Sequence, residues 1–252
     1  MKFTLIKAKN LSIYHQLVLE EALLRTSNKN ICLLNTSTPP SVVMGISAKP
    51  EEHLEKAFFS QNEIALIRRF SGGGTVIVDK DSFFVTLIMN RQELAFPCYP
   101  ENLMEFAEKP VSKAFKEISL LQNDFVIGNK KCAGNAQMLT KDRALHHISF
   151  LWDFCEKRMG FLKHPKRIPE YRADRSHLDF LVPLKNTFTY KEKLMPYFAK
   201  AFVSLFEVDT TLTLDMQTEE GALFFEKITK PEHRRATLLM QEGKIELHNY
   251  VL

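Results

Sequence analysis

The chain has 252 residues, a formal net charge of +4 and 45% hydrophobic residues, a composition typical of a globular protein with a sizeable core. So small a positive excess favours an anionic ligand or an acidic partner, and excludes the strongly basic surface expected of a nucleic-acid-binding protein. The N-terminal residues are too interrupted for a secretory signal, and no apolar run approaches the roughly 18 residues of a membrane span. The four cysteines have no CxxC spacing, so we expect reduced thiols in a cytoplasmic protein and no protein metal cluster.

The first part of the chain alternates short apolar runs with turn-forming residues. Helical spacing of apolar residues predicts an amphipathic helix over 11–25, and a short helix is expected over 51–60. Such apolar runs between turns are typical of strands. Strands are expected over 1–7, 31–34, 41–45, 64–70, 75–79 and 83–89.

The second part of the chain mixes helices with one hairpin. A helical stripe covers 101–120, where Pro110 is expected to kink or split the helix, and Gly128 with Asn129 predicts a hairpin turn. The further predictions are strands over 124–127, 131–133 and 144–154, a mostly irregular stretch over 160–186, helices over 191–208 and 219–230, and a strand pair over 244–252. Together these elements predict an α+β fold with a mixed, largely antiparallel β-sheet flanked by helices, in a single domain over 1–252.

Residues 71–74 (Ser-Gly-Gly-Gly) join two apolar strands with three glycines, although a simple hairpin needs only one or two. The excess indicates that something approaches the backbone here, and free N–H groups in such a loop can bind an anion. The loop lacks the lysine of a P-loop and the spacing of a dinucleotide fingerprint. Arg68 and Arg69 precede it, and a guanidinium beside such a turn suits a phosphate or carboxylate. A flexible hairpin with solvated arginines explains the same residues equally well.

Lys131 is followed along its expected strand by small residues that open space around its side chain. A lysine there can neutralise charge that develops in a transition state, although a solvated lysine is the commoner case. His146 and His147 are strand neighbours that point to opposite faces, so they are not expected to share a metal ion, and one ring can face a pocket. The same alternation puts Cys132 on the face opposite Lys131, in the core, which disfavours a catalytic thiol.

Three motifs in this order resemble the lipoate–protein ligase family. The run 68–79 (RRFSGGGTVIVD) is similar to the family's glycine-loop signature, and 123–124 (ND) with 131–137 (KCAGNAQ) is similar to its lysine motif. Residues 140–147 continue the similarity, which covers about the first 185 residues. The resemblance implies the biotin/lipoate ligase fold, related to class II aminoacyl-tRNA synthetases. It also implies a ligase core over 1–186, with 187–252 as a helical C-terminal extension of the same domain.

The resemblance implies a reaction in two steps: lipoate and ATP form lipoyl-AMP, and a lysine of a lipoyl-domain carrier protein then attacks that adenylate. It implies ATP, Mg²⁺ and (R)-lipoate as ligands. The implied partners are 2-oxoacid dehydrogenase E2 subunits or the glycine-cleavage H protein, with a separate accessory subunit if no accessory domain is attached. Lys131 is the implied catalytic residue. The implied ATP-binding residues are Arg69, Gly74, Thr75, Val76, Ile77 and Lys131; the implied lipoate-binding residues are Ser71, Gly72, Gly73, Gly134, Asn135, Ala136 and His147; Asn123 and Asp124 are candidates for contact with the adenylate or Mg²⁺.

Two alternatives stay open. An octanoyl or lipoyl transferase moves its acyl group through a cysteine thioester, but residues 119–122 (SLLQ) contain no cysteine where one subgroup has it. A non-catalytic lipoate-binding protein is the other alternative. Met138, in place of a basic residue, and Ile148, in place of a glycine, motivate it because both depart from the family's pattern. The preferred acyl chain, the carrier protein and the oligomeric state do not follow from the sequence.

Overall fold

The computed structural model describes residues 1–36, 38–60, 63–166 and 168–241. Its strands are β1 (Lys2–Lys9), β2 (Asn30–Thr36), β3 (Ser41–Met44), β4 (Ala65–Arg68), β5 (Val76–Val78), β6 (Ser82–Asn90), β7 (Ser119–Leu121), β8 (Asp124–Ile127), β9 (Lys130–Leu139), β10 (Arg143–Leu151), β11 (Glu207–Asp215) and β12 (Leu238–Gln241). Its α-helices are α1 (Ile13–Thr26), α2 (Pro50–His53), α3 (Lys56–Phe59), α4 (Pro100–Ala114), α5 (Glu156–Met159), α6 (His177–Phe180), α7 (Leu194–Leu205) and α8 (Glu219–Ile228). None of the helices in these described ranges has the length and apolar character needed to cross a membrane.

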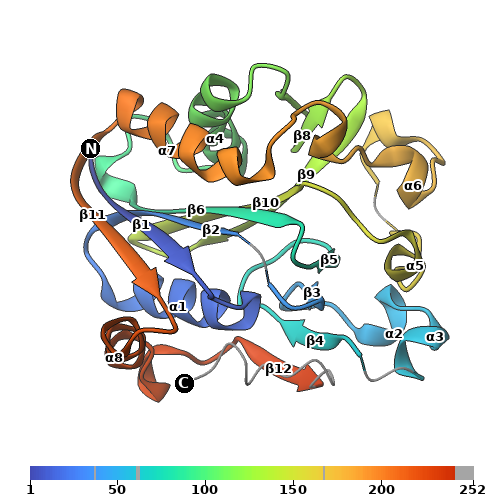
Figure 1. Ribbon diagram of the computed structural model, residues 1–252, viewed down its shortest axis with the longest axis horizontal. Helices are drawn as coiled ribbons and strands as arrows, with labels where there is room; N and C mark the ends of the chain where they lie inside the picture. Colours follow the sequence, from blue (N-terminus) through green and yellow to red (C-terminus); the bar gives the residue numbers. More distant parts are fainter. Residues whose placement is uncertain (37, 61–62, 167, 242–252) are drawn as a thin grey trace.

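The strands form two sheets. The larger has eight strands in the order β11-β1-β2-β6-β10-β9-β8-β7, and the smaller has four in the order β12-β4-β3-β5 (Figure 1). The pairings of β1 with β2 and β11, and of β3 with β4, are parallel, and the other pairings are antiparallel. The predicted α+β fold with a mixed, largely antiparallel sheet is therefore confirmed, with the difference that the strands divide between two sheets.

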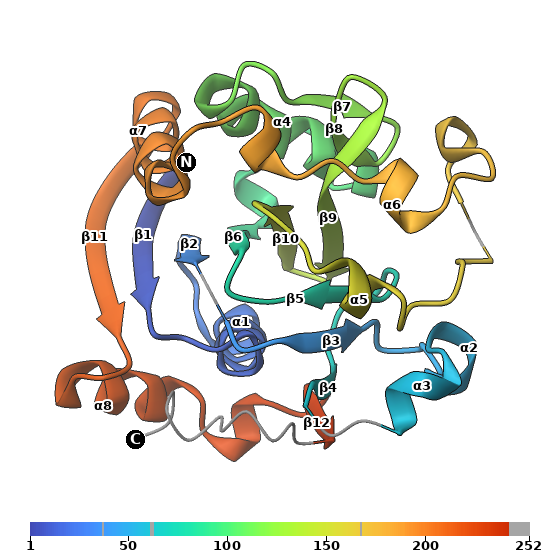
Figure 2. The same ribbon diagram turned by 45° about the vertical axis from the view of Figure 1, so that its right-hand side comes forward.

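Helices α4 and α7 cover one face of the large sheet, on the side opposite α1 (Figures 1 and 2). Phe106 of α4 and Phe198 and Phe202 of α7 pack there against apolar side chains of the sheet. Strand β6 is buried along both faces except at its last residue, which explains why residues 83–89 are apolar without alternation, apart from Thr86. This layer forms the larger part of the core.

Helix α1 lies between the two sheets (Figure 2). Its N-terminus is capped by Ser12, whose Oγ accepts a hydrogen bond from the His15 N–H. Leu19 and Leu23 pack toward the large sheet, and Ile13 and Leu17 pack toward strands of the small one. The predicted helix is confirmed, but it is buried on nearly all sides, so its polar residues Gln16, Glu20 and Glu21 are buried as well.

Most predicted elements are found close to their predicted positions, and the differences are local. The expected helix over 51–60 is two short helices, α2 and α3. The prediction over 101–120 is wrong at its C-terminal end, because α4 ends at Ala114 and β7 follows; α4 also continues through Pro110 without being split. Strand β9 extends well past 133, to Leu139, because it pairs with β10 as well as β8. The strand pair expected over 244–252 lies outside the described residues.

The region after Asn186 contains strands that its sequence pattern did not predict. Strand β11 pairs in parallel with β1 at the edge of the large sheet, and β12 pairs with β4 at the edge of the small one. The expected helices are present as α7 and α8, with Pro196 in the first turn of α7. This region thus contributes an edge strand to each sheet.

Candidate active site

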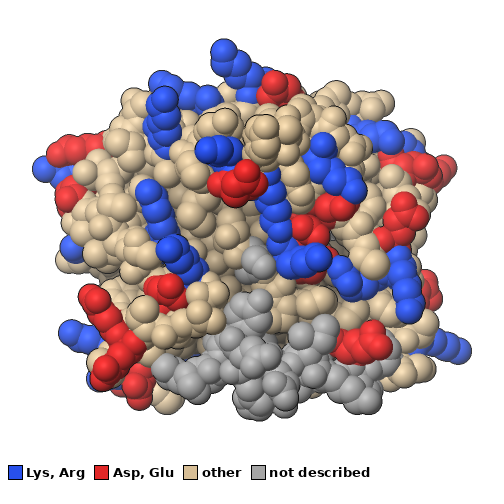
Figure 3. Space-filling view, in the orientation of Figure 1, with Lys and Arg blue, Asp and Glu red and all other residues tan. Residues whose placement is uncertain are grey.

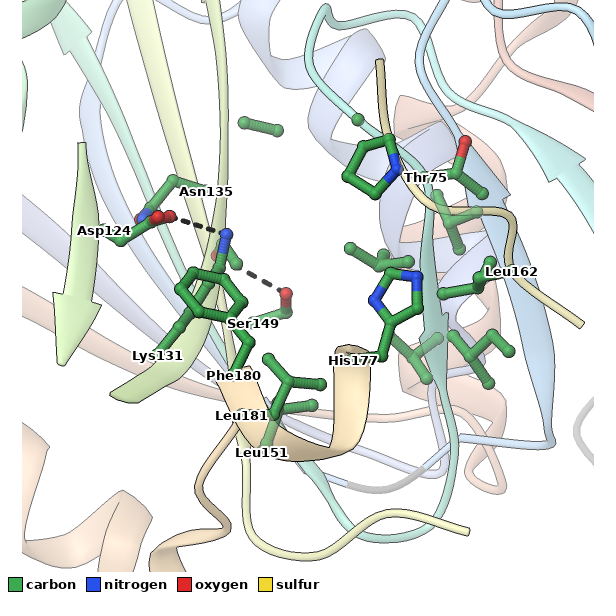
Figure 4. A pocket seen from close by; sticks show the side chains of 18 of the residues that line it. Thr75, Asp124, Lys131, Asn135, Ser149, Leu151, Leu162, His177, Phe180 and Leu181 are labelled. Atoms are coloured by element: carbon green, nitrogen blue, oxygen red, sulfur yellow. Dashed lines mark hydrogen bonds and ion pairs between the residues drawn. The ribbon is translucent and has the colours of Figure 1, made fainter. Parts of the chain in front are cut away.

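A cavity of about 510 Å³ opens beside the β8–β9 hairpin, between β9, the chain around β5 and the segment 159–181 (Figure 4). The start of α1 adds Ile13 and Leu17 to its wall. The site residues expected from the sequence that line the cavity are Arg69, Gly74, Thr75, Val76, Ile77, Asn123, Asp124, Lys131, Gly134, Asn135, Ala136 and His147. The described wall does not include Ser71, Gly72 or Gly73.

Lys131 extends from β9 into the cavity, where its Nζ lies 2.6 Å from Oδ1 of Asp124 (Figure 4). The other oxygen, Asp124 Oδ2, accepts a hydrogen bond of 2.8 Å from the Tyr171 hydroxyl. Burial, and then the charge and hydrogen bond of Asp124, raise the pKa of Tyr171, so this phenol stays a donor at neutral pH. Asp124 thus fixes the Lys131 ammonium through one oxygen and is itself fixed by Tyr171 through the other.

The backbone of the segment after Tyr171 is attached to the same strand. The Val182 N–H donates to the Lys131 carbonyl over 2.9 Å, and Leu181 forms an isolated parallel bridge with Lys131. Leu181 and Phe180 also line the cavity near the lysine (Figure 4). The segment therefore closes one side of the space around the Lys131 side chain.

The guanidinium of Arg69 organises the glycine-rich loop from inside. It is only 4% exposed, and it donates from Nη2 to the carbonyls of Gly72 (2.7 Å) and Gly74 (2.9 Å). It also donates from Nη1 to the Val43 carbonyl over 3.3 Å. Burial lowers the pKa of Arg69 to about 10, with the nearby Glu20 charge opposing that shift, so the group keeps its charge. Arg69 lines the cavity, but its donors are largely used by the loop.

Glycine is required at two positions around this loop. Gly73 has a φ of +100°, a backbone conformation that other residues rarely adopt. A Cβ on Gly45 would lie 2.3 Å from the Gly73 carbonyl oxygen, so Gly45 permits the close approach of the two segments. At Gly72 and Gly74 an added Cβ would meet no atom within 4 Å. Gly73 and Gly45 therefore shape the loop, whereas the space beside Gly72 and Gly74 is open.

His147 faces the cavity, whereas His146 faces the α4–α7 side of the sheet, as strand alternation predicts. The Nδ1 of His147 lies 2.9 Å from Glu20 Oε1 and 3.1 Å from Thr86 Oγ1. Gln16 and Thr86 each donate to the same Glu20 oxygen. This buried network fixes the orientation of the His147 ring. His146 bonds Gln137 instead, and burial lowers its pKa to about 3, so it is a neutral core residue.

The cavity wall has an apolar part and unpaired polar atoms. Apolar side chains that line it include Ile13, Leu17, Val43, Phe84, Leu151, Leu162 and Ile168. The Oγ1 of Thr75 and the Oδ1 of Asn135 are buried and have no hydrogen-bond partner among the described residues. Buried polar atoms of this kind are normally paired, so these two are unusual features of the wall. The wall can hold an aliphatic chain with a polar end.

The segment 159–181 contains cavity residues that the sequence analysis missed. Lys163, Arg172 and His177 line the cavity together with Phe180, and His177 lies across the cavity from Lys131 (Figure 4). Sequence reasoning described this stretch only as a loop with prolines and mixed charge. The cluster of Tyr171, Arg172, Arg175 and His177 was a signal that could have marked it.

The cysteines lie away from the cavity. Cys32 and Cys132 are buried in the core cluster next to α4 and α7, and none of the described lining residues is a cysteine. Burial raises the pKa of the Cys132 thiol to about 12, despite the opposing charge of Lys131. The prediction that Cys132 points into the core is confirmed. Met138 and Ile148 also lie outside the described cavity wall.

The described residues contain no group of three or more His, Cys, Asp or Glu side chains suited to hold a metal ion. Asp124 is the only carboxylate among the described lining residues, and both of its oxygens are engaged by Lys131 and Tyr171. Mg²⁺ can bind through one or two carboxylates together with substrate phosphates. The cavity thus offers Mg²⁺ no ready-made protein site.

The sequence matches a family model described as the lipoyl protein ligase A/B catalytic domain over residues 12–186. The chain is 27% identical over 242 residues to a protein of Plasmodium falciparum named inactive lipoate–protein ligase 2, and the match covers 71% of this chain and 62% of that protein. The chain therefore spans less than two thirds of that relative's length.

Two solved structures have a similar fold. One is described as a bipartite lipoate protein ligase and its E2 lipoyl domain from Thermoplasma acidophilum, with a TM-score of 0.72 and 18% identity over 92% of this chain and 94% of the other. The second, a lipoate-protein ligase A bound with ATP, has a TM-score of 0.71 and 16% identity over 92% and 96%. At these identities the structures establish the fold alone. The family match covers more than half of the sequence, and the chain belongs to the lipoyl protein ligase A/B catalytic-domain family.

Proposed function

We propose that this chain is a lipoate–protein ligase that activates (R)-lipoate with ATP and transfers the lipoyl group to a lysine of a lipoyl-domain carrier protein. The observation that supports this proposal best is the position of Lys131. Its ammonium projects into a cavity whose wall also has an apolar part, which suits an aliphatic chain. Carboxylate activation by ATP needs a cation at the point where acyl and phosphate oxygens meet. Family membership and the similar ATP-bound structure favour the same reaction.

In the first half-reaction, a carboxylate oxygen of lipoate attacks the α-phosphorus of ATP. A new C–O–P linkage forms, the bond between the α-phosphorus and the bridging oxygen breaks, and pyrophosphate leaves with that oxygen. Lys131 stabilises negative charge on the carboxylate and the α-phosphate. Thr75 and Asn135 supply the unpaired polar atoms of the wall as further contacts. The residues proposed for ATP are Arg69, Gly74, Thr75, Val76, Ile77 and Lys131.

In the second half-reaction, the amine of the carrier lysine attacks the acyl carbon of lipoyl-AMP. The amide bond forms, the C–O bond to the phosphate breaks, AMP leaves, and the amine gives up a proton. Ile13, Leu17 and Phe84 form the apolar wall proposed for the acyl chain, next to His147 and the β9 residues 134–136. The proposed carriers are E2 subunits of 2-oxoacid dehydrogenases or the glycine-cleavage H protein in the cytoplasm. A separate accessory subunit is a further proposed partner.

The other proposed lipoate contacts, Ser71, Gly72 and Gly73, shape the loop behind Gly74 rather than the described wall. Mg²⁺ would enter bound to the nucleotide phosphates, with Asn123 and Asp124 as its nearest proposed protein contacts. We propose one catalytic domain over 1–252, because β11 and β12 complete sheets that begin before residue 70.

A thioester transferase is the weaker alternative, because none of the described lining residues is a cysteine. A non-catalytic lipoate-binding protein is the second candidate, and the similarity to a relative named inactive favours it. Met138 and Ile148, the substitutions that motivated this candidate, lie outside the described cavity wall.

The decisive experiment incubates the protein with ATP, lipoate or octanoate and an apo lipoyl domain, and follows the domain by intact mass. Ligase activity gives a carrier whose mass rises by one acyl group only when ATP is present, together with lipoyl-AMP and pyrophosphate. Acyl transfer from another acylated protein without nucleotide would support the transferase. Lipoate binding without acylation of any of several carriers would support the binding protein and contradict the proposal.

A further inference from the structure

Arg172 is a buried guanidinium in the cavity wall. It is 4% exposed, it ends the short 3-10 helix Glu170–Arg172, and it lines the cavity. Its neighbour Tyr171 bonds Asp124, so Arg172 is fixed close to the Lys131–Asp124 pair. Burial and then the charge of Arg175 lower the pKa of Arg172, and the negative charge of Asp124 opposes that shift.

Among the described residues, the guanidinium of Arg172 contacts only uncharged groups. Its Nε donates to the Arg175 carbonyl over 3.2 Å, and its Nη2 lies 3.5 Å from Nδ1 of His177. The guanidinium packs over the Phe180 ring, 4.7 Å from the ring centroid. No described carboxylate lies within ion-pair distance of it. A buried charge without a counter-charge is costly, so the site favours an anion from outside.

The charges of the cavity wall have an excess of cations. The permanently cationic residues among the described lining residues are Arg69, Lys131, Lys163 and Arg172, against one carboxylate, Asp124. Of these four cations only Lys131 has an acidic partner, Asp124; Arg69 bonds loop carbonyls, Lys163 bonds the Glu51 carbonyl, and the Nε of Arg172 bonds the Arg175 carbonyl. Arg172 is left with fork-like donors and no acidic partner.

His177 lies beside the Arg172 guanidinium in this group of cations. Burial lowers its pKa, and the charges of Arg172, His164 and Lys131 act in the same direction, against a hydrogen bond to the Lys163 carbonyl. The single N–H of the neutral ring is donated from Nε2 to the Lys163 carbonyl, and Nδ1 faces Nη2 of Arg172, so His177 helps to position the guanidinium without adding a further charge. The excess of positive charge in the cavity wall does not extend over the face of the molecule that Figure 3 shows. On that face, Lys and Arg side chains are interspersed with Asp, Glu and uncharged residues.

We propose that Arg172, assisted by His177, binds the phosphate groups of the nucleotide that leave as pyrophosphate. This assignment rests on the proposed function and adds a second cationic contact to it. Lys131 alone is opposed by Asp124, so a triphosphate needs another cation in the same cavity. The planar fork of a guanidinium matches two phosphate oxygens at once. As the bond to the α-phosphorus breaks, charge moves onto the departing phosphates, and Arg172 stabilises it there.

The test compares the full-length Arg172→Gln variant with the wild-type chain by calorimetric titration of ATP, pyrophosphate and lipoate separately. Loss of a charge-assisted contact at a buried site is expected to weaken ATP and pyrophosphate about 10- to 100-fold. Lipoate affinity should stay at the wild-type value. With chemically prepared lipoyl-AMP supplied in place of ATP and lipoate, the variant should acylate the carrier at the wild-type rate.

Arg175→Gln is the matched control. Arg175 also packs over Phe180, at 5.3 Å, and it ties the same segment through the Tyr171 and Arg172 carbonyls, but it does not line the described cavity. If Arg172 only stabilises the segment, both variants lose ATP affinity equally, which overturns the proposal. Unchanged affinity for ATP and pyrophosphate in Arg172→Gln, or a loss confined to lipoate, overturns it as well.

Arg172→Lys covers the case in which Arg172→Gln does not fold, which a thermal melt would show. It retains the charge without the fork, so its ATP affinity should fall between those of the wild type and a charge-free site; a wild-type value would contradict the bidentate role. If the wild-type chain forms no lipoyl-AMP, the proposed function fails, whereas these binding comparisons still decide the role of Arg172.

Discussion

The Nζ of Lys131 and Oδ1 of Asp124 lie 2.6 Å apart in the cavity wall, with side chains 24% and 11% exposed. A carboxylate this close offsets the positive charge of the Lys131 ammonium, which would otherwise stabilise an acyl adenylate. It also fixes the position of a flexible side chain that would otherwise have many rotamers. The pair therefore balances two requirements, the charge and the placement of the ammonium.

Asp124→Asn separates these requirements, because it removes the charge and keeps a polar side chain. We expect tighter ATP binding by a few-fold, since the opposing charge is gone, and a turnover lower by about tenfold, since the ammonium is less well placed. Steady-state kinetics give the KM for ATP and kcat in one experiment. Weaker ATP binding would instead indicate that Asp124 contacts the metal ion bound to the nucleotide phosphates.

Lys131→Ala should abolish adenylation, with a loss of about 10²–10³ in rate, because Arg69 and Lys163 are bonded to carbonyls and Arg172 is assigned to the departing phosphates. Pyrophosphate release is the measurement, and circular dichroism should show an unchanged fold. Lys130→Ala is the control, because the neighbouring lysine is exposed and does not line the cavity. Retention of most of the activity in Lys131→Ala would refute the assigned site.

Arg69→Ala tests whether Arg69 acts on the loop or on the nucleotide. Its removal leaves the buried Val43 carbonyl without its Arg69 donor, at a cost of roughly 1–3 kcal/mol, and also frees the partly buried Gly72 carbonyl, which water can reach more easily. We expect the free energy of unfolding and the ATP affinity to fall together, measured by urea denaturation and by titration. Loss of ATP affinity with an unchanged free energy of unfolding would show that Arg69 contacts the nucleotide directly.

The parts of the site that follow strand alternation could be predicted from the sequence. Lys131 and Cys132, like His146 and His147, are neighbours on strands, and the period of two puts one of each pair in the cavity wall and the other in the core. The family motifs also predicted that the glycine-rich loop and the lysine hairpin belong to one site. Each of these features can be read from a short run of consecutive residues.

The partners of those residues could not be predicted, because they are distant in sequence and meet only through the packing of separate elements. Glu20 meets His147 only because α1 is enclosed between two sheets, where its polar residues must pair inside. Tyr171 and Arg172 lie in the short 3-10 helix Glu170–Arg172, whose position depends on contacts of its segment with Asp124 of β8 and Lys131 of β9. Strand β11 was not predicted, because most of its residues are exposed or partly exposed at the sheet edge and the alternation of apolar and polar residues is therefore weak.

The position of the cysteines predicts that acyl transfer needs no thiol. Cys98 and Cys155 are partly exposed and should be alkylated by iodoacetamide, whereas Cys32 and Cys132 should react only after unfolding. The pKa of Cys132, raised to about 12, keeps that thiol protonated at neutral pH. Intact mass gives the number of labels, and the ligase assay on the same sample should show full activity. Inactivation that follows the labelling of one cysteine would revive the thioester mechanism.

Glu21 predicts a specific loss of stability in acid. Its buried carboxylate accepts hydrogen bonds from the backbone N–H groups of Arg235, Ala236 and Thr237 and from the Thr237 hydroxyl, and it pairs with Arg25. Burial raises the pKa of Glu21, but these hydrogen bonds together outweigh burial and lower it below the ordinary value of 4.5. A carboxyl with a lowered pKa in the folded state stabilises the fold above its unfolded pKa, and this contribution is lost as the pH falls through the folded value.

Glu21→Gln should therefore lower the free energy of unfolding by about 1–3 kcal/mol at pH 7, and the difference from the wild type should shrink as the pH falls below about 4.5. Urea denaturation from pH 7 to pH 3 measures both effects, and hydrogen exchange should show faster exchange at 235–237, just before β12. Glu226→Gln makes the same charge change at an exposed position of α8 and should leave both unchanged. A difference between Glu21→Gln and the wild type that stays constant with pH would mean that the ionised carboxylate does not hold the segment to α1.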